Sequence, residues 1–446
     1  MRRAVCRVDR RLGGHAIKAQ SPAILLFLRG RVRNPPHRQV PRCHEKRLVS
    51  QGENVKNISN ILGGVLFLGV MNMAHAEGTA FTHPGMLSKD IDFTQAKALI
   101  AAKTSPAIDS WNMLQASRYA DANYQPNAVA QVVRGNPSWG KDNYAVLFRD
   151  AAAAYQLAIR WKISGDSAYA DASIKVLDDW SNKLTNIIGT SDKYLASGIY
   201  GYQLANAAEI MRSYPKWTGF PRFKDTMLNV FYPMNHEFIT RHNGYGEAGL
   251  HYWANWDLAN LASMMAIGIL TDRHDIYQEA LTYVKSGPGN GAFRNAMWHV
   301  YTDSGLALVQ ESGRDQGHST LDIALIGVIC QMAWNQGDDL FGFDNNLVLK
   351  ASEYVAKYNL GYDVPWTYYT TSDGTVQTEI SSASRGSTRP IWTLIYNHYN
   401  RVNGLEAKYT KEMMDKFGPE GGAYGANSGG FDQLGYGSLL FNSDVK

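Results

Sequence analysis

A carboxylate, a guanidinium and an imidazole fall within the ten-residue segment ESGRDQGHST, as Glu311, Arg314 and His318. Apolar helical patterns flank this segment, so charged side chains stand where packing residues would be expected. About sixty positions earlier, residues 251–260 (HYWANWDLAN) combine aromatic rings with amides. Aromatic faces suit sugar rings and a guanidinium suits a carboxylate, so the two segments together indicate a site for an anionic sugar.

The segment around Arg314 admits two geometries. If one helix runs through all of it, Glu311, Arg314 and His318 share a face at i, i+3 and i+7. Otherwise the pattern Ser319-x-x-Asp322 begins a helix as a capping box, and His318 lies just before its N-terminus. The positive end of that helix would keep His318 neutral and able to accept a proton. The alternative is a structural ion pair between Glu311 and Arg314 with an incidental histidine.

Residues 251–260 are expected to be helical. His251 and Asn255 are four positions apart and would share one face, with Trp253 and Trp256 on another stripe. We expect Tyr252, Trp253 and Trp256 to form walls for sugar rings, while His251 or Asn255 faces a carboxylate. In the alternative, the aromatic side chains bury the helix and both polar side chains are hydrogen-bonded in the core.

These residue types fit the cleavage of a 4-linked uronic acid polymer by a lyase. The C5 proton of such a sugar is α to the carboxylate, so its removal concentrates negative charge on that group. The reaction needs donors for the carboxylate, a base for the C5 proton and an acid for the departing O4. Arg314 and Asn255 suit the first task, His318 the second and a tyrosine the third. The chain has 25 tyrosines, so composition does not choose among them.

Helical hairpins must position these segments. One pattern occurs three times: an apolar helical pattern, a short turn with Gly or Asp, and a second helical pattern. It is found in residues 158–177, 266–284 and 331–355. Asp166 is the predicted N-cap in the first pair. Such hairpins stack on neighbours to bury their apolar faces, and their irregular spacing favours a ring over an open solenoid, which is the alternative. The fold is therefore predicted to be all-α: an (α/α) toroid, or incomplete barrel, with a loop-built cleft at one end.

Two stretches depart from helix. Residues 362–374 contain Pro365 and lack a helical period. Residues 417–430 are Gly-rich but lack the Gly-x-x-x-x-Gly-Lys-Ser/Thr pattern of a phosphate cradle, so they are predicted to form a closing loop.

The N-terminal region is expected to lie outside the fold. Residues 61–76 form an apolar stretch that ends in Ala-His-Ala, a pattern that signal peptidase accepts, and the stretch is too short to span a bilayer. We expect residues 55–76 to be a signal peptide and residues 1–54 to come from a start codon assigned too far upstream. Residues 77–446 would then form a single toroid domain, and the mature protein would be periplasmic or secreted.

Charge and composition exclude several partners. The whole chain has a formal charge of +4, but residues 1–76 hold 14 of its 44 Lys and Arg and 3 of its 40 Asp and Glu. The remainder has 30 positive and 37 negative side chains, a net charge of about −7, so a nucleic-acid partner is not expected. We expect an anionic polysaccharide substrate, no membrane partner after signal cleavage, and a monomer.

No metal or cofactor is expected. The chain has no His-Glu-x-x-His motif and no cluster of Cys and His. Cys6 and Cys43 fall in the N-terminal region, and Cys330 lies in an apolar run that predicts a buried, inert thiol.

Five motifs follow one another along the chain. They are Arg149–Ala154, Ser164–Asp166, Ala196–Gln203, His251–Trp256 and Glu311-x-x-Arg314-x-x-x-His318. Their order resembles the helical-toroid alginate lyase superfamily, and within it the chain is most like the alginate and glucuronan lyases of polysaccharide lyase family 38. The resemblance covers nearly all of residues 80–441, and it implies the toroid fold, a polyuronate substrate and cleavage by β-elimination.

The chain departs from the best-known branch of that superfamily. In that branch, Asn-Asn-His-x-Tyr-Trp is followed by Glu-x-x-Arg and by a catalytic tyrosine seven positions after the arginine. Tyr252-Trp253 and Glu311-x-x-Arg314 are kept here, but Gly249-Leu250 replaces Asn-His and Leu321 replaces the tyrosine. The acid and base of that branch therefore do not carry over.

The resemblance implies a substitution of roles. His318 takes the place of the base, Asn255 replaces the lost amide, and a tyrosine from elsewhere acts as the acid. Residues 364–370 (VPWTYYT) resemble a segment of the glucuronan-type relatives, which points to Tyr369, with Tyr252 as the substitute. The neighbouring Tyr368 could be part of the core, and the choice among Tyr368, Tyr369 and Tyr252 as the acid stays open.

Further substrate contacts are implied by position. Tyr200, Tyr202 and Gln203 fall where relatives line the cleft, and Arg385 and Arg389 precede the last helix, where they would bind flanking carboxylates. Core packing for the first three and a structural or surface role for the two arginines are the alternatives.

We therefore expect a polysaccharide lyase that cleaves alginate or glucuronan by β-elimination and leaves an unsaturated uronic acid at the new non-reducing end. One alternative is a toroid glycoside hydrolase that acts on uronic-acid oligosaccharides, with carboxylates from Glu247, Asp257, Glu311 and Asp315. The other is a non-catalytic periplasmic glycan-binding protein.

Overall fold

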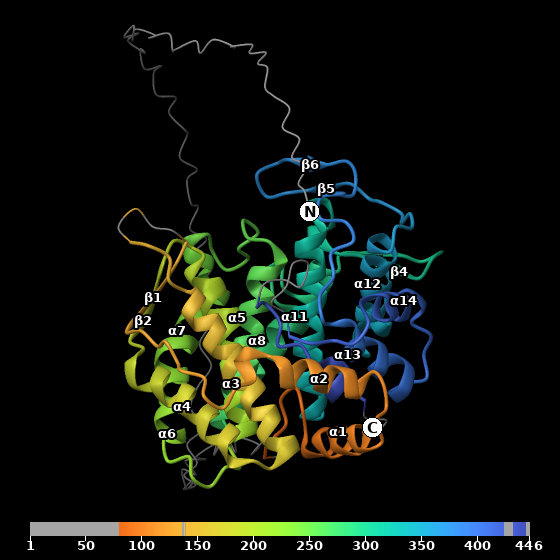
Figure 1. The fold of residues 1–446 in the computed structure, drawn as a ribbon. Coiled ribbons are helices and arrows are strands. Elements are labelled where there is room, and N and C mark those ends of the chain that lie inside the picture. Colours follow the sequence, from red (N-terminus) through yellow and green to blue (C-terminus); the bar gives the residue numbers. More distant parts are fainter. Residues whose placement is uncertain (1–79, 136–137, 139, 423–430, 443–446) are drawn as a thin grey trace, which may run out of the picture. The chain divides into compact units, whose positions relative to one another are not determined.

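Helices dominate the computed structural model, which describes residues 80–135, 138, 140–422 and 431–442 (Figure 1). The expected upstream extension (1–54) and signal peptide (55–76) lie outside the described residues. The α-helices are α1 (Asp90–Ala101), α2 (Ala107–Ala116), α3 (Ala145–Ser164), α4 (Ser167–Lys183), α5 (Lys193–Met211), α6 (Phe220–Thr226), α7 (Tyr232–Arg241), α8 (Ala254–Thr271), α9 (His274–Ser286), α10 (Phe293–Ala296), α11 (Gln316–Asn335), α12 (Phe343–Asn359), α13 (Trp392–Asn397), α14 (Lys408–Phe417) and α15 (Gly437–Leu440). Short 3-10 or π segments are η1 (Arg118–Ala120), η2 (Met227–Phe231), η3 (His242–Gly244), η4 (Gln310–Gly313) and η5 (His398–Val402).

The three predicted helical hairpins are present as α3–α4, α8–α9 and α11–α12. In the first, Gly165 ends α3 with a left-handed backbone at φ 77°, a conformation that glycine adopts without steric cost. Asp166 then caps α4 by accepting a hydrogen bond from the N–H of Ala168 at 2.9 Å, as predicted. Each hairpin therefore turns where the sequence indicated.

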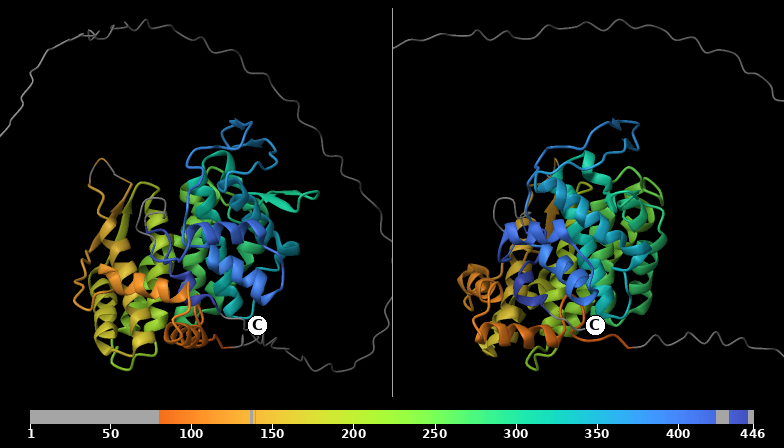
Figure 2. Two further views of the ribbon diagram at one scale, coloured as in Figure 1. Left: turned by 45° about the vertical axis from the view of Figure 1, so that its right-hand side comes forward. Right: turned by 90° about the vertical axis from the view of Figure 1, so that its right-hand side faces the viewer.

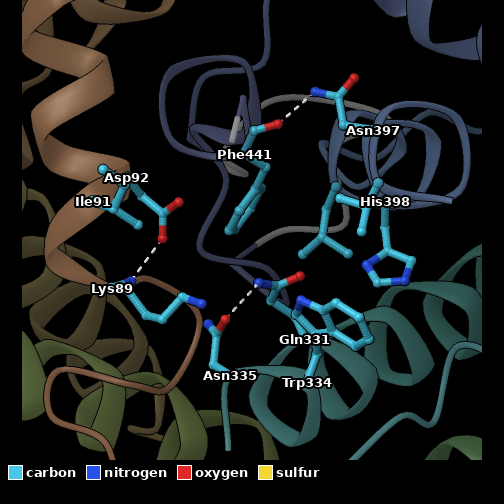
Figure 3. Close-up of a pocket in the computed structure, with 11 residues that line it drawn as sticks. Lys89, Ile91, Asp92, Gln331, Trp334, Asn335, Asn397, His398 and Phe441 are labelled. Atoms are coloured by element: carbon cyan, nitrogen blue, oxygen red, sulfur yellow. Dashed lines mark hydrogen bonds between the residues drawn. The ribbon is translucent and has the colours of Figure 1, made fainter. Parts of the chain in front are cut away.

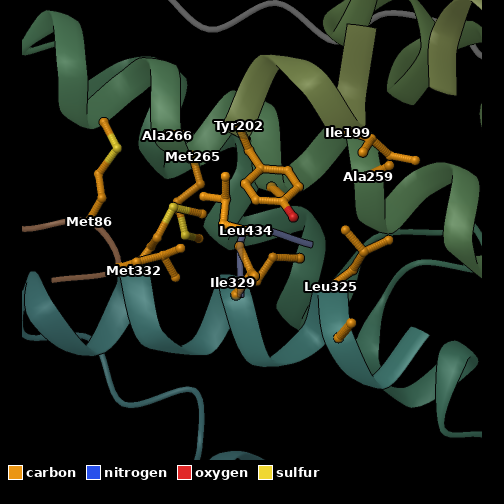
Figure 4. Packing of buried hydrophobic residues seen from close by; sticks show 14 of the residues in the cluster. Met86, Ile199, Tyr202, Ala259, Met265, Ala266, Leu325, Ile329, Met332 and Leu434 are labelled. Carbon is orange, nitrogen blue, oxygen red and sulfur yellow. The ribbon is translucent and has the colours of Figure 1, made fainter. Parts of the chain in front are cut away.

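Three helices, α5, α8 and α11, form the inner layer of the fold. Their residues are buried on nearly every side, whereas α4, α9 and α12 bury one face. α8 packs between α5 and α11, and the helices α3, α9 and α12 pack on the outside of these three. Figure 4 shows side chains of α5, α8 and α11 meeting, among them Ile199, Met265 and Ile329. Helix pairs arranged around inner helices are the predicted (α/α) toroid.

Close packing between α5 and α8 depends on two glycines. A Cβ atom at Gly198 would lie 2.7 Å from the backbone of Ala259, and one at Gly201 would lie 2.3 Å from Oγ of Ser263. Helix axes this close leave no room for a side chain, so the ASGIYGYQ motif serves helix packing. Cys330, on α11, is fully buried as predicted, and burial raises the pKa of its thiol.

The strands form three small two-stranded sheets. β1 (Gln131–Arg134) pairs in parallel with β2 (Asn186–Gly189), whereas β3 (His299–Tyr301) with β4 (Leu306–Leu308) and β5 (Tyr369–Thr370) with β6 (Val376–Gln377) are antiparallel. Both views of Figure 2 place the β5–β6 hairpin at the end of the helices opposite to α1. None of the described helices is long and apolar enough to cross a membrane.

Candidate active site

A cleft of about 1070 Å³ opens beneath the β5–β6 hairpin, and three separate stretches of the chain contribute to it together with Ser191. The lining residues of these stretches are Leu250, His251, Tyr252, Trp253, Trp256, Gln310, Arg314, Tyr369, Thr371, Ser372, Asp373, Thr375 and Gln377. The structure therefore brings together the predicted site residues His251, Tyr252, Trp253, Trp256, Arg314 and Tyr369.

The two polar segments meet because η4 caps the N-terminus of α8. Oε1 of Gln310 accepts a hydrogen bond from the N–H of Ala254 at 3.0 Å, and Oε1 of Glu311 accepts one from the N–H of Asn255 at 2.9 Å. N–H groups in the first turn of a helix have no intrahelical acceptor. A carboxylate there also interacts favourably with the positive end of the helix dipole. Helix α8 consequently begins at Ala254, so the prediction that His251 and Asn255 share a helical face is wrong.

Arg314 is the cation of the cleft. Its Nη1 pairs with Oε2 of Glu311 at 2.8 Å, its Nε lies 3.8 Å from Oδ2 of Asp315, and its Cζ lies 5.3 Å from the centre of the Trp253 ring. The buried carboxylate of Glu311 and the indole of Trp253 together hold the guanidinium in place. The side chain remains 29% exposed and reaches the cleft.

Asn255 and Glu311 lie beneath the cleft and do not line it. Glu311 is fully buried and Asn255 is 2% exposed. The carboxylate of Glu311 is occupied by Arg314 and by the start of α8, and Oδ1 of Asn255 has no hydrogen-bond partner among the described residues. Their predicted contacts with substrate are therefore corrected: Glu311 positions Arg314, and Asn255 is buried in the base of the site.

Tyr369, on β5, reaches the cleft opposite Trp253. Nε2 of Gln310 donates a hydrogen bond to the phenol oxygen of Tyr369 at 2.7 Å, and the amide cannot turn around because its Oε1 already holds the N–H of Ala254. The phenol therefore accepts in this bond and keeps its own proton for another acceptor. Burial raises the pKa of Tyr369, although the Gln310 hydrogen bond opposes the rise. Tyr368 is 66% exposed, so its predicted place in the core is wrong.

His318 lies in the first turn of α11, next to Arg314. Asp315 is the N-cap of this helix: Oδ1 accepts from the N–H of His318 at 2.8 Å, while Oδ2 contacts Nδ1 of the His318 ring at 2.6 Å. The N-cap thus lies four residues before the predicted Ser319 cap, and His318 lies within the helix. Burial raises the pKa of Asp315, but the hydrogen bonds from His318 outweigh it and the net pKa is lowered. The carboxylate of Asp315 lies between His318 and Arg314 and contacts both. His318 itself does not line the cleft.

The aromatic wall of the cleft follows the predicted residues. Tyr252 and Trp256 pack with ring centres 4.9 Å apart. His251 stacks flat on the exposed Tyr245, with ring centres 3.9 Å apart. Tyr252 lines the cleft but is mostly buried, and its hydroxyl accepts a hydrogen bond from Asn243 that holds the ring in the wall. The imidazole of His251 is the polar group that this wall presents to the cleft.

The three α5 residues expected at the cleft are buried. The hydroxyl of Tyr202 donates to the carbonyl of Asp432, and Nε2 of Gln203 donates to the carbonyl of Phe431, both at 2.8 Å. Their predicted substrate contacts are corrected, because these side chains hold residues 431–432 against α5. Tyr200 is also buried, and its hydroxyl accepts a hydrogen bond from Nη1 of Arg134 at 3.3 Å.

Arg385 and Arg389 serve the fold. Arg389 is 6% exposed and pairs with Asp432 at 3.0 Å while donating to the first turn of α11. Arg385 donates to the backbone carbonyls of Tyr358 and Tyr362. The predicted binding of a flanking carboxylate is corrected for Arg389, which is buried and paired with Asp432. Arg385 does not line the cleft, and its binding of a carboxylate stays a prediction.

Several site residues escaped the sequence analysis. Gln310 was missed although it directly precedes the Glu-x-x-Arg motif, and Asp315 was weighed only as a hydrolase carboxylate. Asp315-x-x-His318 is itself an N-cap pattern that could have revealed the pairing. Thr371, Asp373 and Thr375 belong to a hairpin turn whose position over the cleft depends on the tertiary fold.

A second cavity, of about 450 Å³, lies between α1, α11 and α13 (Figure 3). Two of its polar groups are paired within the protein: Oδ2 of Asp92 accepts from the N–H of Lys89, and Asn397 donates to the carbonyl of Phe441. Burial lowers the pKa of His398 to about 4, so this histidine is neutral. In the part of the chain that the structure describes, no three His, Cys, Asp or Glu side chains gather as a metal site. The cleft with Arg314 is therefore the candidate active site.

Comparison with solved structures gives the same fold. The chain matches alginate lyase A1-III from Sphingomonas species A1 at 12% identity and a TM-score of 0.53, over 81% of this chain and 99% of that one. A histidine-to-alanine variant of A1-III complexed with a tetrasaccharide matches at 14% identity and a TM-score of 0.55, over 81% and 96% of the two chains. A tyrosine-to-phenylalanine variant complexed with a tetrasaccharide matches at 13% identity and 0.54, over 81% and 97%. At these identities the likeness establishes the fold.

Sequence comparison identifies the family. No curated protein matches the chain significantly in sequence. The family profile described as alginate lyase matches residues 99–366, more than half of the 446-residue chain. This range includes the helices α3, α5, α8 and α11 and the cleft residues from Ser191 to Arg314. The chain therefore belongs to the alginate lyase family of polysaccharide lyases.

Proposed function

We propose that this enzyme cleaves alginate, a 4-linked polyuronate, by β-elimination. The observation that supports this most strongly is the placement of Arg314 and Tyr369 in one cleft with aromatic walls. Arg314 can neutralise the carboxylate of the sugar that reacts, and Tyr369 can protonate the leaving oxygen. The net charge of about −7 over residues 77–446 makes this local positive charge important for attracting a polyanion.

Arg314 is prepared for the carboxylate before substrate arrives. Glu311 and Trp253 already hold the guanidinium, so binding costs little side-chain entropy. When the C5 proton leaves, negative charge spreads onto the carboxylate, and a fixed cation stabilises this state more than the ground state. The rings of Trp253 and Trp256 give the sugar a surface for stacking.

Tyr369 is the proposed acid. Its phenol accepts from Gln310, so its own proton is free to move to O4 of the leaving sugar as the C4–O4 bond breaks. The raised pKa of Tyr369 keeps the phenol protonated at neutral pH. The electron pair of the broken C5–H bond forms the C4–C5 double bond of the product.

We propose His318 as the base: it does not itself line the cleft, but its side chain is 35% exposed and it shares the carboxylate of Asp315 with Arg314, which does. Asp315 holds Nδ1 of the ring, which leaves Nε2 as the nitrogen that takes the C5 proton, in the way that a carboxylate orients a catalytic histidine. Nε2 has no hydrogen-bond partner among the described residues. We propose that His251, which lines the cleft, binds the carboxylate of a neighbouring sugar.

The finer specificity is also proposed. The resemblance to polysaccharide lyase family 38 supports glucuronan as a second substrate beside alginate. We further propose that the chain works as a monomer in the periplasm or outside the cell, after removal of residues 1–76.

Hydrolysis is less compatible with the cleft. Glycoside hydrolases need two carboxyl groups that flank the bond. Asp373 is the one carboxylate among the described lining residues, and Glu247, Asp257, Glu311 and Asp315 all lie elsewhere. A tyrosine, an arginine and an imidazole fit elimination better.

A panel of substrates tests the proposal. Purified enzyme is incubated with polymannuronate, polyguluronate, polyglucuronate and a neutral glucan, and the ultraviolet absorbance of unsaturated uronate is followed. We expect absorbance to rise with at least one alginate block and to stay flat with the glucan. Cleavage that yields only saturated ends would instead indicate a hydrolase, and binding without cleavage would indicate a glycan-binding protein.

A further inference from the structure

Asp322, in the second turn of α11, is a buried acid that the reaction above does not use. The residue is 0% exposed, and neither carboxyl oxygen receives a hydrogen bond from a donor group of the described residues. An ionised carboxylate without donors is strongly unfavourable in a protein interior. Its surroundings must therefore decide its protonation state.

The charges around Asp322 are already balanced without it. The charged groups that face it are Glu311, Arg314 and Arg389. Arg314 pairs with Glu311 at 2.8 Å, and Arg389 pairs with Asp432 at 3.0 Å. A further carboxylate at this point would have no cation of its own.

Glu311 is the ionised member of the two neighbouring acids. One of its oxygens accepts from the N–H of Asn255 and the other from Arg314, so both act as acceptors. The carboxyl group of Asp322 lies within hydrogen-bonding reach of Glu311. Two carboxylates this close cannot both be ionised without strong repulsion, so one of them holds a proton. Asp322, which has no donors, is that one.

We propose that Asp322 stays protonated in the working enzyme, donates its proton in a hydrogen bond to Glu311, and so leaves the charge of Arg314 available to a substrate carboxylate. Burial raises the pKa of Asp322 well above its usual range, and the negative charge of Glu311 raises it further. If Asp322 ionised, two buried anions would lie under one cation, and the cleft would attract a polyanion less. Asp322 is thus a positioning residue, and its effect on KM rests on the proposed lyase function.

The variant D322N tests this protonation state, because an amide has the shape of a carboxylic acid and is also a donor. Asp150 offers a matched control: it is equally buried, but its oxygens accept hydrogen bonds from Tyr124, Asn127 and Trp180. We expect D322N to keep or raise the thermal midpoint near neutral pH and D150N to lower it. The buried Glu420 also has a raised pKa, of about 7, so its carboxylic acid band must be separated from that of Asp322. Subtracting the D322N spectrum from the wild-type spectrum should isolate the infrared band of protonated Asp322, and D150N should keep that band.

Kinetics on a polyuronate test the effect on Arg314. Near neutral pH, D322N should keep kcat/KM within about threefold of the wild type. If the infrared band is lost at alkaline pH, KM of the wild type should rise over the same pH interval, while KM of D322N stays constant. The proposal is also supported if the infrared band persists at every pH measured and the wild type and D322N have equal KM.

Three results would overturn the proposal. They are the absence of the band in the wild type, a band that fades without a rise in KM, and a loss of thermal midpoint in D322N as large as in D150N. The infrared and thermal measurements need no substrate, so a failure of the proposed lyase function would be recognised separately, by the absence of product from the wild type.

Discussion

At the scale of single residues, the adjacent tyrosines Tyr368 and Tyr369 differ in their surroundings. Tyr369 receives the Gln310 hydrogen bond inside the cleft, whereas Tyr368 is exposed. We predict that Y369F lowers kcat by about 100-fold or more, because the leaving oxygen loses its proton donor, with little change in KM. Y368F should retain wild-type rates in the same initial-rate assay. Equal losses in the two variants would remove Tyr369 from the mechanism.

Asp315 can be tested without loss of the helix cap. Asparagine caps helices as well as aspartate does, so D315N should keep the thermal midpoint of the wild type. It cannot hold Nδ1 of His318 as a carboxylate does, and we predict a fall in kcat of about 10-fold or more. D166N, at the N-cap of α4, is the matched control and should leave kcat unchanged. A D315N enzyme as fast as D166N would show that the His318 pairing is structural.

The sequence identified residues of the cleft better than it predicted their geometry. Arg314, Trp253 and Tyr369 follow from residue type, spacing and resemblance, and the cleft contains all three. Asn255 was misplaced because the start of α8 is set by Gln310, which lies 56 positions after Ala254 and is brought there by the fold. A local helical pattern cannot contain that information.

At the scale of elements, the β5–β6 hairpin places a carboxylate over the cleft. Asp373 accepts a hydrogen bond from the N–H of Thr375 in the hairpin turn and lines the cleft. We predict that D373N lowers KM for a polyuronate a few-fold at low ionic strength, because one repulsive charge is removed, and that added salt reduces the difference. D303N, in the turn between β3 and β4, should leave KM unchanged. A salt-independent effect, or the same effect in D303N, would contradict this explanation.

Long helices were predictable and short strands were not. The hairpins α3–α4, α8–α9 and α11–α12 each span many turns with a regular apolar pattern, which made them visible in the sequence. The strands are two to four residues long, too short for an alternating pattern to be recognised. Residues 362–374 were correctly expected to be non-helical, but their position above the cleft was not predictable.

For the whole molecule, an N-terminal segment couples stability to pH. His83 contacts Glu209, at the end of α5, and Asp272, which follows α8. Burial lowers the pKa of His83, but the hydrogen bond and charge of Glu209 outweigh it, and the net pKa is raised. The contribution to stability is therefore complete below the unfolded pKa of about 6.5 and is lost as pH rises through the folded pKa.

Thermal midpoints across pH test this coupling. We predict that H83Q is less stable than the wild type in acid and that the difference shrinks as pH rises. H236Q, which removes an exposed contact with Glu279, should show a much smaller pH-dependent difference. A difference between H83Q and the wild type that grows with pH would contradict the assignment.

The N-terminal region gives a further prediction at this scale. The described fold begins at residue 80, and the backbone of Leu87 is already bonded to the buried Asn206 of α5. We predict that a chain of residues 77–446 has the thermal midpoint and kcat of the longer chain, and that exported protein begins near Glu77. Peptides from residues 1–54 in mass spectra of the native protein would contradict the proposed start.

The removal of the C5 proton is the step on which the proposed mechanism depends. A polyuronate deuterated at C5 would be digested and the products weighed. β-Elimination predicts that each new non-reducing end has lost its deuterium and is lighter by one water than a hydrolysis product. Products that keep the deuterium and carry saturated ends would contradict the roles assigned to Arg314, His318 and Tyr369.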